Sequence, residues 1–241
     1  MAAMAKEVLA RLPEGVWQSV GSWHGKRIMP RSDAAFAGQV QALTHPDQCT
    51  EQPDLVLECA SQQAVAEFGE AIVKRGWRLA VISTGALADA ALQLRLQQAC
   101  TRYHGRLIVL SGAVAGMDGL ASAREGGLDS VTYQSSKSPA SWRGSPAEKL
   151  INLDAVSEAQ VFFEGSAREA ASMFPANANV AATIALHGLG MDATRVRLQV
   201  DPHTQRNTHP LTGVWASLAS SRLSCAATRW PATRKRQRWR R

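Results

Sequence analysis

The sequence lacks the features that would assign it to several specialised classes of protein. It has no apolar run of about eighteen residues, the length a bilayer-spanning helix needs, and no cationic segment followed by an apolar one at its start. Its four cysteines show no Cys-x-x-Cys spacing, which argues against a zinc site and against a disulfide framework. We therefore expect a cytoplasmic protein with reduced thiols, without a signal peptide, a metal site or membrane association.

Basic charge is confined to one end of the chain. Of the 27 Lys and Arg residues, eight lie beyond Gly213, where there is no acidic residue, so residues 1–212 carry 19 basic and 20 acidic side chains. A near-neutral body argues against a specific nucleic-acid partner, and a block of like charge at the end could bind polyanions only nonspecifically.

The stretch from residue 54 to residue 116 alternates between apolar runs and helical periodicity. Apolar runs at 54–60, 78–83 and 106–111 predict buried strands, and the segments between them predict helices, the first capped by Ser61 and ended by Gly76. This β-α-β-α-β order predicts parallel strands with right-handed crossovers. Because ligands bind such sheets at the carboxyl ends of the strands, we expect the small-residue turns at 58–61, 83–86 and 111–113 to line one crevice.

The next hundred residues have a different pattern. We predict helices at 117–127 and 169–190, strands at 128–137, 156–165 and 193–202, and a proline-broken connection at 138–153. This order is typical of an α+β domain with a partly antiparallel sheet. Near the start, residues 4–12 have the periodicity of a helix, and residues 17–48 give no clear prediction.

Five segments carry a family resemblance: STGALAD at 83–89, SGAVAGMDGL at 111–120, SSKSPASWRG at 135–144, the long run at 163–186 and RNTH at 206–209. In these segments the chain resembles the L-aspartate dehydrogenases, relatives of the homoserine-dehydrogenase-like enzymes. The resemblance implies oxidation of L-aspartate at Cα by NAD or NADP, giving iminoaspartate that feeds NAD biosynthesis or hydrolyses to oxaloacetate and ammonia. It also implies a homodimer.

The same resemblance implies roles for three residues. Ala113 and Asn179 take the positions of cofactor-binding residues, and His209 takes that of the catalytic histidine. An imidazole can exchange a proton with the substrate amine near neutral pH, so we expect His209 to act as general acid and base. Without the resemblance, Asn179 is equally suited to cap a helix, and His209 to lie in a polar surface turn. Candidates for binding the substrate carboxylates are Lys137, Arg143 and Arg206, and His203 is at most a neighbour of the site.

The sequence departs from the family pattern at both ends. There is no G-x-G-x-x-G, so the first strand and glycine turn of the dinucleotide-binding domain are expected to be missing. Beyond RNTH, the tail is expected to be disordered or the product of a reading-frame shift near Val214. The sequence thus predicts a Rossmann-like α/β domain (1–111), an α+β substrate and dimerisation domain (112–212) and a basic tail (213–241). Two alternatives stay open: an inactive remnant that binds polyanions, and another amino-acid or semialdehyde dehydrogenase.

Overall fold

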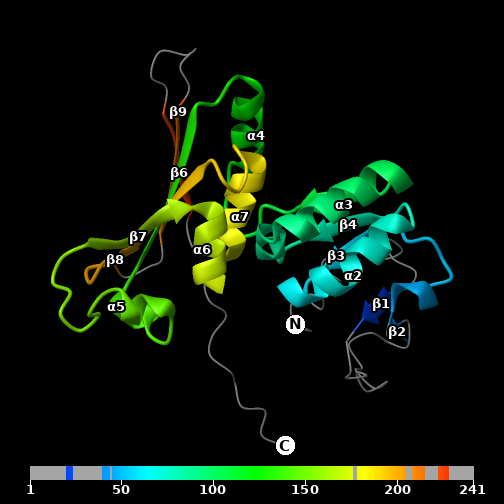
Figure 1. Cartoon of the computed structure of the whole chain (residues 1–241), viewed down its shortest axis with the longest axis horizontal. Helices are drawn as coiled ribbons and strands as arrows, with labels where there is room; N and C mark the ends of the chain where they lie inside the picture. The colour runs from blue at the N-terminus through cyan, green and yellow to red at the C-terminus, as the bar shows by residue number, and fades with distance from the viewer. Residues whose placement is uncertain are drawn as a thin grey trace, which may run out of the picture. The chain divides into compact units, whose positions relative to one another are not determined.

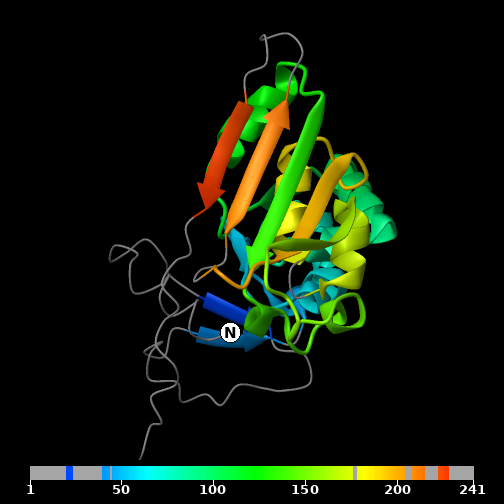
Figure 2. The same ribbon diagram turned by 90° about the vertical axis from the view of Figure 1, so that its left-hand side faces the viewer.

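A computed structural model of the chain describes residues 20–23, 40–43, 45–175, 178–204, 208–214 and 222–227. The chain divides into two compact units, Met1–Val109 and Leu110–Arg241, which are described separately. Figures 1 and 2 show their helices and strands. None of the helices in these residues is long and apolar enough to cross a membrane.

The first unit contains a parallel three-stranded sheet with two crossover helices, as the sequence predicts. In chain order these elements are β3 (Val56–Glu58), α2 (Gln62–Lys74), β4 (Arg78–Val81), α3 (Ala90–Tyr103) and β5 (Arg106–Val109). The helices contact each other and the sheet (Figure 1). A short parallel pair, β1 (Val20–Trp23) and β2 (Val40–Leu43), lies in the region without a prediction, and the helix expected at 4–12 lies outside the described residues.

Local signals in the sequence set the limits of α2. The Ser61 hydroxyl accepts a hydrogen bond from the Ala64 amide at 3.2 Å and so caps the first turn. Gly76 follows the last turn with φ +77°, a left-handed conformation that glycine adopts without steric penalty. Both predictions from the sequence are confirmed.

Gly105 marks a close approach between the end of α3 and the end of α2. A Cβ atom there would lie 2.3 Å from the carbonyl oxygen of Val73 and 2.8 Å from its Cγ1 atom, and Val73 is fully buried. We expect Gly105→Ala to lower the free energy of unfolding by about 1–3 kcal/mol, because a backbone atom of a packed helix must move.

Gly119 provides the matched control. It lies within α4 (Met117–Glu125), and a Cβ atom there would meet no atom within 4 Å. Gly119→Ala is expected to raise the free energy of unfolding by about 0.5–1 kcal/mol, because alanine restricts the unfolded chain. Urea denaturation measures both variants. Equal stability of the two would contradict the crowding at Gly105.

The second unit is built on a five-stranded sheet in the order β10-β9-β6-β8-β7. The strands are β6 (Ser130–Lys137), β7 (Gln160–Ser166), β8 (Thr194–Val200), β9 (His209–Val214) and β10 (Arg222–Ala227). Only β6 and β8 pair in parallel, which confirms a partly antiparallel sheet. Figures 1 and 2 show α4, α6 (Ala167–Met173) and α7 (Ala178–His187) on one face of this sheet.

Three predictions for this unit need correction or detail. The single helix expected at 169–190 is two helices, α6 and α7. Helix α6 ends before Phe174, because Pro175 disfavours helical geometry at the residue that precedes it. The connection at 138–153 contains two short turns, α5 (Pro139–Trp142) and η4 (Pro146–Lys149). Residues 222–227, expected to lack regular structure, form β10 and pair with β9.

Candidate active site

The carboxyl ends of β3 and β4 are joined through one buried carboxylate, that of Glu58. Its Oε1 atom accepts hydrogen bonds from the Ala60 amide at 2.6 Å and from the Ser83 hydroxyl at 3.0 Å. Its Oε2 atom accepts from the Ser83 amide at 2.9 Å and from the Ile82 amide at 3.3 Å. Glu58 is 9% exposed, so these four bonds replace most of the hydration that its charge loses. These bonds therefore fix the turn after β3 and the turn after β4, two of the three turns expected to bind a ligand, in position relative to each other.

Cys59 lies between these bonded residues and is no candidate nucleophile. Burial, assisted by the negative charge of Glu58, raises the pKa of its thiol. A nucleophilic cysteine needs the opposite shift, toward the thiolate. The described residues also contain no group of three His, Cys, Asp or Glu side chains able to hold a metal ion.

The turn after β5, at residues 110–116, has the backbone geometry of a ligand-binding turn. Gly112 and Gly116 have φ values of +60° and +79°, and a Cβ atom added at Gly112 would meet nothing within 4 Å. Ala113 is exposed beside Gly112. Helix α4 starts directly after Gly116, whose position as N-cap provides no side-chain hydrogen bond. Open space, a methyl side chain and uncapped helix amides suit a negatively charged or carbonyl-bearing part of a cofactor.

His209 begins β9 and bonds to a buried tyrosine. The hydroxyl of Tyr133, on β6, lies 2.8 Å from Nδ1 of His209, and the two rings are stacked with their centroids 6.0 Å apart. The paired residues Tyr133–Leu211 and Ser136–Thr208 place Ser135 opposite His209. Tyr133 is therefore the diagonal neighbour of His209 on the same face of the sheet. His209 is half-buried and does not lie in a free surface turn.

The surroundings of His209 favour its neutral form. Burial, and then the positive charge of Lys137, lower the pKa of the imidazole to about 4. The ring is thus neutral at physiological pH without a ligand. Burial also raises the pKa of the Tyr133 phenol, so its hydroxyl keeps its proton.

The other predicted residues differ in their surroundings. Lys137 ends β6, close enough to influence His209, and its Nζ atom lies 4.8 Å from the centre of the Trp142 ring. Arg143 forms an exposed ion pair with Asp154, so its charge already has a partner. His203 is exposed in the turn after β8, and Arg206 lies outside the described residues. Asn179 is the second residue of α7 and is exposed.

The sequence reasoning missed the two residues with the most specific contacts. Glu58 was seen only as part of a turn, and Tyr133 only as part of a strand. Glu58 could have been found, because a glutamate at the end of an apolar strand is placed for burial, and a buried carboxylate requires several hydrogen-bond donors. Tyr133 had no comparable signal, since its partner lies 76 residues away.

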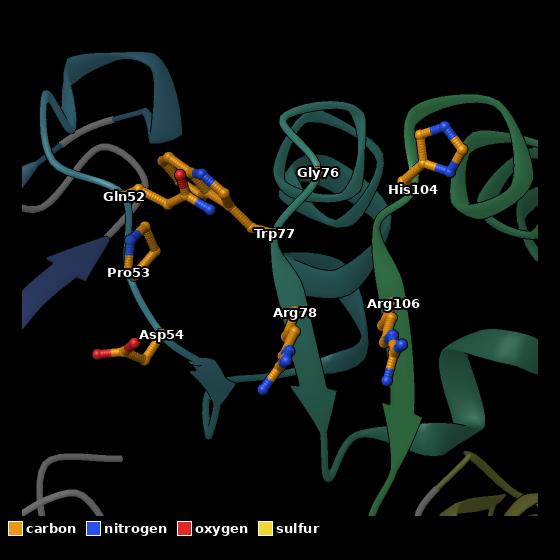
Figure 3. A pocket seen from close by; sticks show the side chains of 8 residues that line it. All are labelled: Gln52, Pro53, Asp54, Gly76, Trp77, Arg78, His104 and Arg106. Carbon is orange, nitrogen blue, oxygen red and sulfur yellow. The ribbon is translucent and has the colours of Figure 1, made fainter.

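A separate hollow lies at the amino ends of β4 and β5. It has a volume of about 540 Å³, and Figure 3 shows the side chains of Arg78 and Arg106 projecting from neighbouring strands. The other lining residues are Gln52, Pro53, Asp54, Gly76, Trp77 and His104. Because it lies away from the carboxyl ends of the strands, we do not assign it to the candidate site.

Comparisons with known proteins agree with this geometry. Residues 16–110 match the NAD-binding domain of homoserine dehydrogenase, and residues 118–233 match the C-terminal domain of aspartate dehydrogenase. Fold and family models together define a nicotinamide-dependent dehydrogenase.

Individual relatives specify the family. The chain is 80% identical to an L-aspartate dehydrogenase of Serratia proteamaculans over 212 residues, which are 87% of this chain and 79% of that protein. It is 47% identical, with the same coverage, to an L-aspartate dehydrogenase of Acinetobacter baumannii. The crystal structure of aspartate dehydrogenase from Thermotoga maritima superposes with a TM-score of 0.71 at 26% identity, over 94% of this chain and 86% of that one. The chain belongs to the L-aspartate dehydrogenase family.

Proposed function

We propose that this protein oxidises L-aspartate to iminoaspartate with NAD or NADP, and that iminoaspartate feeds NAD biosynthesis or hydrolyses to oxaloacetate and ammonia. The observation that carries the proposal is the 80% identity to the Serratia enzyme over 87% of the chain, which includes both units. Similarity of this extent does not favour the alternative of an inactive polyanion-binding remnant.

The residues of the candidate site suit this reaction. Bound NAD or NADP supplies the acceptor for the hydride that leaves Cα of the substrate. Ala113 and Asn179 are proposed to contact that cofactor, Ala113 in the open turn beside Gly112 and Asn179 from the exposed start of α7. Hydride leaves Cα only when the nitrogen lone pair is free, so a proton must first leave the substrate ammonium group. His209 is the proposed acceptor of this proton.

Lys137 is the proposed partner of a substrate carboxylate. Its positive charge lies close enough to His209 to lower the pKa of the imidazole. A carboxylate paired with Lys137 would cancel this effect and so favour proton uptake by His209. Arg143 is less suited, since Asp154 already pairs with it.

The experiment that tests the function is an assay of aspartate-dependent reduction of NAD and of NADP by the purified full chain. We expect reduction with L-aspartate, and much slower reduction with L-homoserine or D-aspartate. Aspartate semialdehyde is included to test the alternative of a semialdehyde dehydrogenase. A folded sample that reduces neither cofactor with L-aspartate would contradict the proposal.

The assembly and the compartment are also proposals. We propose a homodimer, on the basis of the family resemblance, which light scattering coupled to size-exclusion chromatography tests. We propose the cytoplasm as its compartment, because Cys49, Cys59 and Cys100 are free thiols and a reducing compartment preserves them.

A further inference from the structure

The contact between Tyr133 and His209 is more specific than core packing requires. Tyr133 is 1% exposed and occupies the interior face of β6, where a phenylalanine would fill nearly the same volume. Its hydroxyl meets the Nδ1 atom of His209 at 2.8 Å. A buried hydroxyl without a hydrogen-bond partner is destabilising, so this position is unfavourable unless the bond forms.

The surroundings of the hydroxyl determine the direction of this hydrogen bond. The hydroxyl of Ser135, two residues away on the same face of β6, is a hydrogen-bond partner of the Tyr133 hydroxyl and can take the phenolic proton. The Tyr133 oxygen can then accept a hydrogen bond from Nδ1 of His209. A neutral imidazole that donates at Nδ1 keeps a lone pair on Nε2.

We propose that Tyr133 is a positioning residue for His209: its oxygen accepts a hydrogen bond from Nδ1, fixes the orientation of the ring, and leaves the lone pair of Nε2 to face the substrate. This inference rests on the proposed function, in which His209 exchanges a proton with the substrate. In the ligand-free protein, Nε2 of His209 thus carries a lone pair that can accept a proton from the substrate ammonium group.

A hydroxyl suits this task better than a carboxylate would. A carboxylate accepts only, so it favours the protonated imidazole and raises its pKa. The oxygen of a hydroxyl accepts the Nδ1 proton without adding a negative charge, and its own proton can be donated to Ser135. Tyr133 thus holds the ring in the tautomer that can accept the substrate proton, without favouring the charged form.

Tyr133→Phe tests the proposal, with Tyr103→Phe as its matched control. The chain has only these two tyrosines, and Tyr103 is exposed at the end of α3. Removing the Tyr133 hydroxyl is expected to lower kcat about tenfold and to change KM for aspartate less than kcat, because the group acts through His209. Tyr103→Phe is expected to change neither constant.

Nitrogen NMR of the full chain, with its histidines isotopically labelled, reports the tautomer of His209. A purely structural role of Tyr133 would leave this tautomer unchanged. The signals of His209 are those lost in His209→Asn. We expect the native protein to show the Nδ1–H tautomer at neutral pH and Tyr133→Phe to show a mixture of tautomers. A native Nε2–H tautomer, a tautomer unchanged in Tyr133→Phe, or an unchanged kcat would overturn the proposal.

The outcomes remain separable from the proposed function. The native spectrum decides the tautomer even where Tyr133→Phe does not fold. A native protein that shows the Nδ1–H tautomer but no reduction of NAD or NADP with aspartate would contradict the proposed function and leave the hydrogen bond established.

Discussion

His209→Asn is expected to lower the kcat of aspartate oxidation by a factor on the order of 10²–10⁴, the range that general acid and base groups contribute. Asparagine is the informative substitution, because its amide can take the place of Nδ1 beside the Tyr133 hydroxyl while nothing takes the place of Nε2. The variant should therefore remain folded and bind the cofactor, with the loss confined to catalysis.

The measurement is steady-state oxidation of aspartate, with circular dichroism and urea denaturation to confirm folding. His203→Asn is the control, since His203 is an exposed histidine in the turn that precedes β9. It is expected to keep native turnover. Retention of most of the activity by His209→Asn would remove His209 from the reaction.

Glu58→Ala is expected to lower the free energy of unfolding by about 3–5 kcal/mol. The substitution removes the acceptor for three amides and one hydroxyl, of which the Ser83 amide and hydroxyl are buried. In Glu58→Gln the amide nitrogen would face donors on one side, so we expect an intermediate loss. We also expect a raised KM for NAD or NADP, because the turns at 59–61 and 82–84 would no longer be tied together.

Urea denaturation monitors stability, and the variants are compared with Glu67→Ala. Glu67 lies on α2 close to Glu58 in sequence, but it is exposed and its removal should change stability by less than about 0.5 kcal/mol. A Glu58→Ala protein as stable as Glu67→Ala would show that the four hydrogen bonds contribute little.

The sequence predicted the elements of the first unit well because their signals are local. Ser61 lies one residue before the start of α2 and Gly76 two residues after its end, and helices that connect consecutive strands favour parallel pairing. The two short strands β1 and β2 fall in a region without clear periodicity, and four residues are too few to produce one. The break between α6 and α7 had a local signal, Pro175, which could have been used.

The candidate site was predicted only as single residues. Resemblance placed a function on His209, but its neutral state depends on burial and on Lys137, which is 72 positions earlier and reaches it only through the pairing of β6 with β9. The same register brings Tyr133 to Nδ1. Such contacts depend on the register of strands distant in sequence, which a single sequence does not encode in any local pattern.

The pairing of β10 with β9 gives part of the basic tail a structural role. Without β10, the strand that begins with His209 would be an edge strand, with one row of backbone groups open to water or to another molecule. Edge strands fray most readily at their ends, and His209 is the terminal residue of β9. Ala227 is paired with His209 in this register, so β10, which lies within the last twenty residues of the chain, stabilises the backbone at the histidine. The precision of the candidate site therefore depends on backbone pairing with a strand close to the end of the chain.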